Sequence, residues 1–456
     1  MKIVINQNIE VVNPPPKLVR RLKEKLILPN PLYLAAKRGG RRPWGIPRQI
    51  KLLEQTKNKI VIPRGCMDDI RPYISKAEVV DERVLFSPNP VPTLIEERFY
   101  QEDGIRELLE YEEGFLKAPA GSGKTVMGLE LIARVGQPAL WLTHLDRLFK
   151  QVLERIELFI PAAAERGIGE IREGNIAISD FLTIGMVPSL IRMDLSKWQD
   201  FFGMVLVDEA HHVPANTFFE VIRQFKPYHL YGLTATDYRN DGLDPVMFRV
   251  VGNVRANIPY DTLVEAGQII RPTIRYVPTN FYMRTEGITK NLYQKVVKKI
   301  VMNKARNKLI AHHVLKEAKE KKICIVISGR RIHCRDLHKR ISKEWPQTAL
   351  AIGDIKKKEV DAAIKAMEDG EVNVLITTFE MLGEGFDLDK LDRLFFTVPF
   401  KAPNRVEQGI GRLQRTASGK KDAVVYEFAD EQVSYCMYLY NRRLEVYDRL
   451  RVGVDR

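Results

Sequence analysis

The sequence has few of the features that mark secreted, zinc-bound or membrane proteins. Its 456 residues include 4 cysteines, and none of these form a CxxC pair. Scattered cysteines argue against a zinc site and a disulfide framework, and they favour a reducing cytoplasm. No apolar run approaches the roughly 18 residues that a membrane span needs. The start of the chain alternates like a strand and lacks the form of a signal peptide. We therefore expect no membrane partner.

Acidic residues are too few to balance the basic ones. The chain holds 72 Lys and Arg residues against 58 Asp and Glu residues, which gives a formal net charge of +14. Such an excess favours a polyanionic partner. The chain is 45% hydrophobic and long enough for two or three domains with real cores.

A glycine-rich turn followed by a lysine is the most informative segment. An apolar run before it indicates a strand, and helix-forming residues follow it. Its glycines let backbone N–H groups turn toward phosphate oxygens, and a helix N-terminus favours anions. Lys124 can reach the outer phosphates, and the Thr125 hydroxyl can bind Mg2+. We predict a phosphate-binding loop made of Ala118, Pro119, Ala120, Gly121, Ser122, Gly123, Lys124 and Thr125.

Two carboxylates follow a second apolar run, Met204 to Val207. Such a run is typical of a buried parallel strand, and ligands bind beyond the carboxyl ends of these strands. Asp208 would hold Mg2+, and Glu209 would polarise an attacking water. Together with the phosphate loop, this pair predicts nucleotide hydrolysis.

Four motifs in order give the chain a resemblance to superfamily 2 helicases. Residues 208–211 read as a DEAH box, and 233–236 as the coupling motif that follows it. Residues 408–415 match the arginine-finger motif QxxGRxxR, and residues 377–387 resemble the motif before it. Within the superfamily the chain is similar to the XPB, RadD and phage UvsW group of DNA translocases and branch-migration helicases. One departure is Arg239-Asn240-Asp241, where XPB-type proteins carry Arg-Glu-Asp.

The resemblance implies that ATP and Mg2+ are the cofactors. Gln101 would read the adenine edge, with an aromatic residue stacking nearby, and Gly385 and Asp387 would contribute to the nucleotide site. His211 and Gln408 would couple the two lobes. Arg412 and Arg415, three apart in an expected helix, would face the same side and reach the γ-phosphate.

The resemblance also implies DNA as a partner, with RNA as an alternative. Contacts to the nucleic-acid backbone along one face of both lobes would come from Thr143, Arg147, Thr183, Ser328, Arg330 and Thr377. Such contacts carry no sequence information and are sensitive to salt. Near the N-terminus, a basic helix and a basic loop with one aromatic residue could add a duplex or junction contact. Their residues are Arg20, Arg21, Arg41, Arg42 and Trp44.

Strand and helix patterns alternate over most of the chain, which predicts an α/β fold with parallel sheets. We expect two RecA-like parallel-sheet lobes and a small N-terminal α+β accessory domain. Three prolines in residues 87–92 suggest a linker. The expected divisions are 1–93 for the accessory domain, 94–272 for lobe 1, 273–300 for a connector and 301–456 for lobe 2.

The leading interpretation is an ATP-dependent DNA helicase or translocase that acts on duplex or branched DNA in repair or recombination. It would work in the cytoplasm of a bacterial or phage-infected cell. An RNA helicase and the motor subunit of a restriction or defence complex remain alternatives. A nucleotide-gated binding protein without motor activity is a third alternative, against which Glu209, Arg412 and Arg415 argue.

Overall fold

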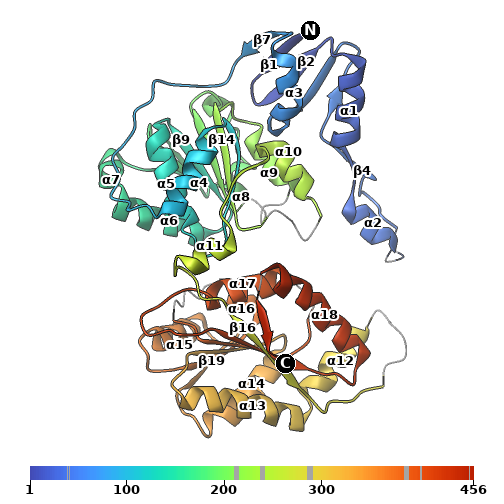
Figure 1. Ribbon diagram of the computed structural model, residues 1–456, viewed down its shortest axis with the longest axis vertical. Helices are drawn as coiled ribbons and strands as arrows, with labels where there is room; N and C mark the ends of the chain where they lie inside the picture. Colours follow the sequence, from blue (N-terminus) through green and yellow to red (C-terminus); the bar gives the residue numbers. More distant parts are fainter. Residues whose placement is uncertain are drawn as a thin grey trace. The chain divides into compact units, whose positions relative to one another are not determined.

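The computed structural model describes residues 1–38, 40, 42–209, 215–236, 242–284, 291–384, 390–400, 403–450 and 452–455. The chain forms two compact units, Met1–Pro259 and Tyr260–Arg456. Figure 1 shows the helices and strands of each unit. No helix within these described ranges is long and apolar enough to cross a membrane.

The first unit opens with a small mixed sheet in the order β5-β6-β2-β1-β7. The pairing is antiparallel except between β1 and β7. Alternate residues of β1, β2 and β6 are buried, so this sheet covers a core on one face. The strands are β1 (Lys2–Ile5), β2 (Asn8–Val12), β5 (Glu54–Gln55), β6 (Lys59–Pro63) and β7 (Glu78–Asp81).

Two helices and a projecting segment, here called the arm, complete this N-terminal region. Helix α1 (Pro16–Leu26) buries Leu18, Leu22 and Leu26, and α3 (Met67–Ile74) follows the 3-10 turn η1 (Arg64–Cys66). The arm is a strand pair with a helix between its strands, and Figure 1 shows α2 standing away from the small sheet. Its elements are β3 (Ile27–Pro29), α2 (Pro31–Arg38) and β4 (Gln49–Lys51). The expected α+β accessory region is confirmed.

The rest of the first unit is a larger sheet in the order β11-β10-β12-β9-β13-β14-β8-β15. Its pairs are parallel except β10 with β11. The strands are β8 (Glu113–Lys117), β9 (Ala139–Thr143), β10 (Gly169–Arg172), β11 (Asn175–Ala177), β12 (Leu182–Met186), β13 (Met204–Asp208), β14 (His229–Thr234) and β15 (Val254–Asn257).

Helices pack against this sheet, as an α/β lobe requires. They are α4 (Phe99–Leu109), α5 (Lys124–Val135), α6 (Asp146–Phe159), α7 (Pro161–Arg166), α8 (Val187–Leu190), α9 (Ala215–Ile222) and α10 (Asp244–Val251), with the 3-10 turn η2 (Ser196–Trp198). The central strands are buried almost throughout, which explains their continuous apolar runs in the sequence.

The second unit is built on a parallel sheet in the order β18-β19-β17-β20-β21-β16-β22. Its strands are β16 (Thr273–Pro278), β17 (Cys324–Ser328), β18 (Thr348–Ala351), β19 (Val374–Thr378), β20 (Arg393–Phe396), β21 (Val424–Ala429) and β22 (Gly453–Asp455). Its helices are α11 (Tyr260–Glu265), α12 (Leu292–Val301), α13 (Lys304–Lys319), α14 (Arg331–Ser342), α15 (Lys357–Glu368), α16 (Phe379–Glu384), α17 (Pro403–Leu413) and α18 (Ser434–Arg449). The two parallel-sheet lobes are therefore confirmed.

The segment 273–300 differs from the expected connector. Strand β16 pairs in parallel with β21 inside the second sheet, and α12 buries Val296, Val297 and Ile300 in the core of the same unit. Both elements are part of the second unit because their apolar faces have partners only there among the described residues. The boundary at residue 93 stays a proposal.

A buried charge pair ties the second unit together and generates a stability prediction. The Arg306 guanidinium donates to Asp430 Oδ1 at 2.7 Å and to Thr397 O at 2.6 Å. The Arg306 and Asp430 side chains are each about 1% exposed. Arg306→Met should lower the unfolding free energy by about 3–5 kcal/mol, because the Asp430 carboxylate would stay buried without its cation. Calorimetry of the full chain would measure this loss.

The matched control for that experiment is Arg442→Met. Arg442 pairs with Glu445 on α18, and its side chain is 45% exposed. A pair of this kind contributes at most about 1 kcal/mol. Equal destabilisation by the two substitutions would contradict the importance of the buried pair.

Candidate active site

Three neighbouring parallel strands bring the predicted motifs of the first unit to one edge of its sheet. β14 lies between β13 and β8, with Leu233 opposite Asp208 and Thr234 opposite Lys117. The segments that follow these strands therefore meet at the carboxyl edge, where open α/β sheets bind ligands. The phosphate loop, the carboxylate pair and the coupling motif all begin there.

The predicted strand, loop and helix around the glycine-rich turn are all present. β8 ends at Lys117, and α5 begins at Lys124. Gly121 and Gly123 have φ angles of 87° and 85°, which glycine adopts without strain. The Ala118 N–H donates to the Thr234 carbonyl at 3.0 Å, so the start of the loop is bonded directly to the coupling motif.

Gln101 lies under this loop. Its amide nitrogen donates to the Ser122 carbonyl at 2.9 Å, and its amide oxygen accepts from the Arg98 N–H at 2.9 Å. A Cβ at Gly123 would lie 2.5 Å from the Gln101 nitrogen and would displace the end of that side chain, in addition to the strain at its positive φ. The side chain is 4% exposed and supports the loop. That Gln101 reads adenine stays a prediction, and the exposed ring of neighbouring Phe99 is available for stacking.

The Lys124 ammonium is held inside the curl of the loop. Its Nζ donates to the Ala118 carbonyl at 3.2 Å and to the Pro119 carbonyl at 3.4 Å. It lies 3.5 Å from Glu209 Oε1. The loop, the lysine and the carboxylate pair therefore form one cluster, as the sequence predicts.

The two carboxylates have different surroundings. Asp208 ends β13 and is 3% exposed, and burial together with the nearby Glu209 charge raises its pKa, with Lys124 acting in the opposite direction. Glu209 has a φ of 48°, a conformation uncommon for residues other than glycine. Its side chain is half-buried. A cation beside Asp208 would stabilise its charged form.

The residues at this edge fit Mg2+ and a phosphate chain. Asp208 and the half-buried Thr125 supply the oxygen ligands that Mg2+ prefers. The Ser122 hydroxyl is buried and has no hydrogen-bond partner in the described part of the chain. In those same residues, no group of three or more His, Cys, Asp and Glu side chains could hold a metal. Mg2+ at nucleotide sites takes few carboxylates and uses phosphate oxygens, so this donor set is sufficient.

The arginine-finger motif of the second unit is only partly helical. Arg412 lies in the last turn of α17, which ends at Leu413. Arg415 instead forms a backbone bridge with Ile269, and its carbonyl accepts from Lys420 Nζ at 2.7 Å. The prediction that both arginines share one helix face is wrong, because the chain leaves the helix to pair with residue 269. Both side chains are half-buried.

Several predicted residues lie outside the described part of the structure. They are Arg41, His211, Gly385 and Asp387, together with the 239–241 element. Gln408 lies in α17, but its side chain is also outside the description.

The hydroxyls predicted to contact a nucleic-acid backbone are buried. Thr183 Oγ1 accepts from the Ser179 N–H, Ser328 Oγ is 2.9 Å from His333 Nδ1, and Thr377 Oγ1 donates to the Ala351 carbonyl. Thr143 is also 0% exposed. All four side chains are 0% exposed in the described structure, and their contact with a nucleic-acid backbone stays a prediction.

Two arginines of that predicted set do reach the surface. Arg147 is exposed in the first turn of α6, and Arg330 is half-buried just before α14. Both follow the carboxyl ends of parallel strands, β9 and β17. Their position suits contacts to phosphate oxygens.

The basic residues of the accessory region divide into two kinds. The Arg20 side chain is 84% exposed, and Arg42 and Trp44 are also exposed, Trp44 at 83%. Arg20 pairs with the exposed Glu24 at 3.8 Å, whereas Arg21 donates to Oδ1 of the buried Asp69 at 2.8 Å.

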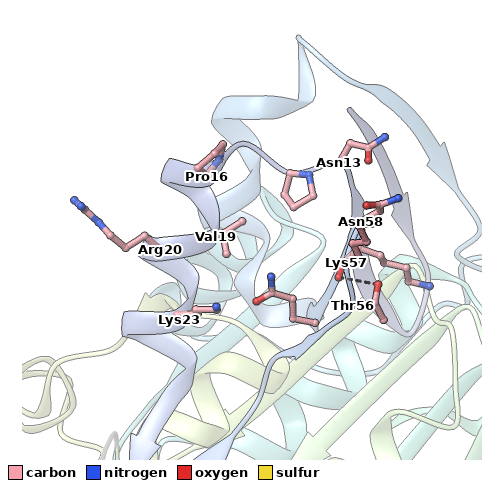
Figure 2. A pocket seen from close by; sticks show the side chains of 11 residues that line it. Asn13, Pro16, Val19, Arg20, Lys23, Thr56, Lys57 and Asn58 are labelled. Carbon is pink, nitrogen blue, oxygen red and sulfur yellow. Dashed lines mark hydrogen bonds between the residues drawn. The ribbon is translucent and has the colours of Figure 1, made fainter.

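A hollow of about 560 Å³ lies between α1 and the turn that joins β5 to β6. Figure 2 shows Lys23 between α1 and this turn, while Arg20 extends outward from the helix. Lys57 lines the opposite side. Neither lysine was predicted as a site residue, because the turn comes close to α1 only once β6 has paired with β2.

Comparisons with known proteins agree with this geometry. Residues 94–239 match the family described as "Type III restriction enzyme, res subunit", and residues 304–417 match "Helicase conserved C-terminal domain". The DNA 3'-5' translocase XPB2 of Sulfurisphaera tokodaii is 23% identical over 79% of this chain and 88% of its own length. The ATP-dependent DNA helicase uvsW of Enterobacteria phage T4 is 22% identical over 74% of this chain and 69% of its own.

A third relative matches a shorter stretch. A Halobacterium salinarum sequence with the name DNA 3'-5' helicase Rad25 is 32% identical over 45% of this chain, and the match spans 35% of that protein's length. Among solved structures, S. cerevisiae Dbp5 bound to RNA and ADP BeF3 superposes with a TM-score of 0.52 at 15% identity. The match covers 80% of this chain and 90% of the Dbp5 chain, and it supports the two RecA-like lobes. The phosphate loop and DEAH carboxylates, the helicase domains in both units and these relatives place the chain in the superfamily 2 helicases, within the XPB and UvsW group.

Proposed function

We propose that this chain is an ATP-dependent DNA translocase or helicase that acts on duplex or branched DNA. The observation that carries the proposal is the cluster of Lys124, Asp208 and Glu209 at one edge of the first sheet. This cluster is suited to phosphoryl transfer, and two relatives that span most of this chain, XPB2 and uvsW, have names that denote action on DNA. The net charge of +14 suits a polyanionic track.

In this proposal each site residue of the first unit has a defined role. The loop N–H groups and Lys124 hold the phosphates. Thr125 and Asp208 hold Mg2+, which neutralises charge on the phosphates when bound. Glu209, the more exposed of the two carboxylates, orients the attacking water. The bond from Ala118 to Thr234 links the loop to the coupling motif.

The second unit would supply further positive charge at the phosphates. We assign Arg412 and Arg415 to the γ-phosphate, where a positioned arginine stabilises the transition state. Arg147 and Arg330 would contact the nucleic-acid backbone, one from each unit.

The accessory region would contact the DNA duplex or junction. Arg20, Lys23 and Lys57 surround the hollow beside α1 and are exposed. Lys59 also lines it, but it forms an ion pair with Glu10 at 2.5 Å. Phosphate oxygens are the natural partners of such lysines and arginines.

The direct test of the proposed function is ATP turnover with matched single-stranded DNA, duplex DNA, forked DNA, a four-way junction and RNA. Duplex or branched DNA should stimulate turnover several-fold more than RNA of the same sequence. Strongest stimulation by RNA would instead assign the chain to RNA. Absence of any stimulation, with ATP still bound, would contradict motor activity.

Glu209→Gln should lower turnover by at least about 100-fold, because it removes the base that orients water. Binding of ATP should change little, since Lys124 and the loop remain. Equilibrium binding of a fluorescent nucleotide and steady-state turnover measure the two effects separately. Turnover at the unsubstituted rate would remove Glu209 from the mechanism.

The triple reversal of Arg20, Lys23 and Lys57 to Glu should weaken binding of forked DNA and leave basal turnover unchanged. The slope of log affinity against log salt should fall by about one unit per lost phosphate contact. The control reverses Lys319, Lys321 and Lys343, which are exposed near the amino ends of β17 and β18, away from the carboxyl edge of the second sheet. If both triple variants shift the salt slope equally, the hollow has no special role.

A further inference from the structure

The accessory region docks on the amino-terminal edge of the first unit's larger sheet. Residues of η1 and α3 contact the residues that begin β14, β8 and β15, three neighbouring strands. The phosphate loop follows the opposite end of β8, and the carboxylates lie at the same edge of the sheet, at the end of β13 beside β14. We call this contact between η1, α3 and the starts of the three strands the dock. It is separated from the site of nucleotide chemistry by the length of a strand, roughly 20 Å for six residues.

Arg64 is the centre of this dock. Its side chain is almost fully buried, and its two terminal nitrogens donate to the Pro227 and Tyr228 carbonyls. These carbonyls lie directly before β14, which begins at His229. Next to them, Val84 and Pro227 form a parallel bridge, so the segment leaving the small sheet is bonded at the same place.

A second group of polar contacts joins α3 to the starts of β15 and β8. Asp68 accepts from Arg255 Nη2 at 2.8 Å and from Asn253 Nδ2 at 2.7 Å. Burial opposes the charge on Asp68, but the bonds from these two residues outweigh it and lower its pKa. Arg71 donates to Glu112 at 3.0 Å. Each pair joins an element of the accessory region to the start of a strand in the larger sheet.

The dock is also closely packed. A Cβ at Gly65 would lie 2.5 Å from Gly252 N and 2.6 Å from the Arg249 carbonyl, so the two backbones touch where α10 ends. Met67 and Ile70 belong to the same apolar core as Val246 and Val250 of α10. The turn η1, which leads into α3, packs directly against α10. Backbone contact of this kind leaves no room for the two parts to slide.

Burying a charged side chain without a carboxylate partner is costly, which makes Arg64 unusual for a merely space-filling residue. Burial, together with the Arg83 charge, lowers its pKa to about 10, so the guanidinium remains charged at neutral pH. Its planar fork bonds two successive carbonyls at once, a geometry that lysine cannot reproduce. The group therefore fixes both the position and the orientation of η1 relative to β14.

We propose that Arg64 is a positioning residue that fixes the accessory region to β14, so that this region moves with the first unit as one rigid body. β14 is bonded at both ends, to Arg64 through residues 227 and 228 and to the phosphate loop through Thr234. The hollow beside α1 is thereby held at a constant distance from the phosphate loop. The consequence for DNA rests on the proposed function, whereas the rigid dock does not.

The test compares the full chain with Arg64→Met and Asp68→Ala. Hydrogen exchange without nucleotide or DNA is measured in peptides that cover 64–72, 82–86 and 226–230. Basal ATP turnover and the number of base pairs unwound per ATP on a forked duplex are measured in parallel. Arg106→Met is the matched control, because Arg106 is 66% exposed and pairs only with Asp103 among the contacts described.

In Arg64→Met the dock peptides should exchange at least about tenfold faster, since two carbonyls lose their donors, while β9 and β13 keep their protection. Basal turnover should stay within about twofold, and unwinding per ATP should fall about tenfold. Asp68→Ala, a milder change at a partly exposed residue, should shift the same quantities in the same direction. The Arg106 variant should match the unsubstituted chain.

Unchanged exchange in the dock peptides of both variants would overturn the proposal. So would a parallel fall in turnover and unwinding, because general destabilisation lowers both by the same factor. If the unsubstituted chain moves on no nucleic acid, the proposed function fails, and the exchange measurement still decides whether Arg64 holds the dock.

Discussion

Parallel pairing of β14 with β13 on one side and β8 on the other is the constraint on which the candidate site depends. It places Asp208 and Glu209 at the same sheet edge as the phosphate loop, although the two motifs are far apart in the chain. The hydrogen bond from Ala118 to Thr234 then ties the loop to the end of β14. Any change in register would separate Lys124 from Glu209, because each strand directs its following residues to a fixed point.

Buried charges in this protein are consistently held by several oxygen atoms. Lys124 has two backbone carbonyls and Glu209 around its ammonium. Arg306 bonds Asp430 and backbone carbonyls, and Arg443 bonds Glu427 and the Phe400 carbonyl. Such networks define position well, because each partner satisfies a group that would be costly to leave unpaired. At Lys124 the arrangement also keeps a cation available for phosphate.

Contacts of the same kind attach the accessory region to the larger sheet. It has its own sheet, yet its core is continuous with that of the larger sheet, and charged residues join the two. A region attached in this way transmits force, whereas one on a flexible linker would not. The proline-rich stretch at 87–92 is accordingly bonded to the lobe, through Asn89 to Gly136 and Val91 to Ala133.

The sequence by itself determined the class of fold and the nucleotide-binding motifs. Apolar runs bounded by turns located most central strands, and local spacing identified Gly121, Gly123, Lys124, Asp208 and Glu209, because the backbone geometry of a loop and of a strand end depends on nearby residues. The N-terminal α+β region could be predicted from the sequence for the same reason. Alternation of polar and apolar residues in β1, β2 and β6 indicates one buried face.

Only the tertiary structure decided which polar residues reach the surface and which segments join which unit. Thr183, Ser328 and Thr377 were predicted to contact a nucleic-acid backbone, and the structure buries all three side chains. Arg21 and Arg64 are equally basic in the sequence, yet one forms an ion pair with Asp69 and the other is buried against residues 227 and 228. The end of α17 at Leu413 and the pairing of β16 with β21 likewise depend on partners distant in the chain. Burial and long-range pairing are properties of the packed whole, so no local pattern could specify them.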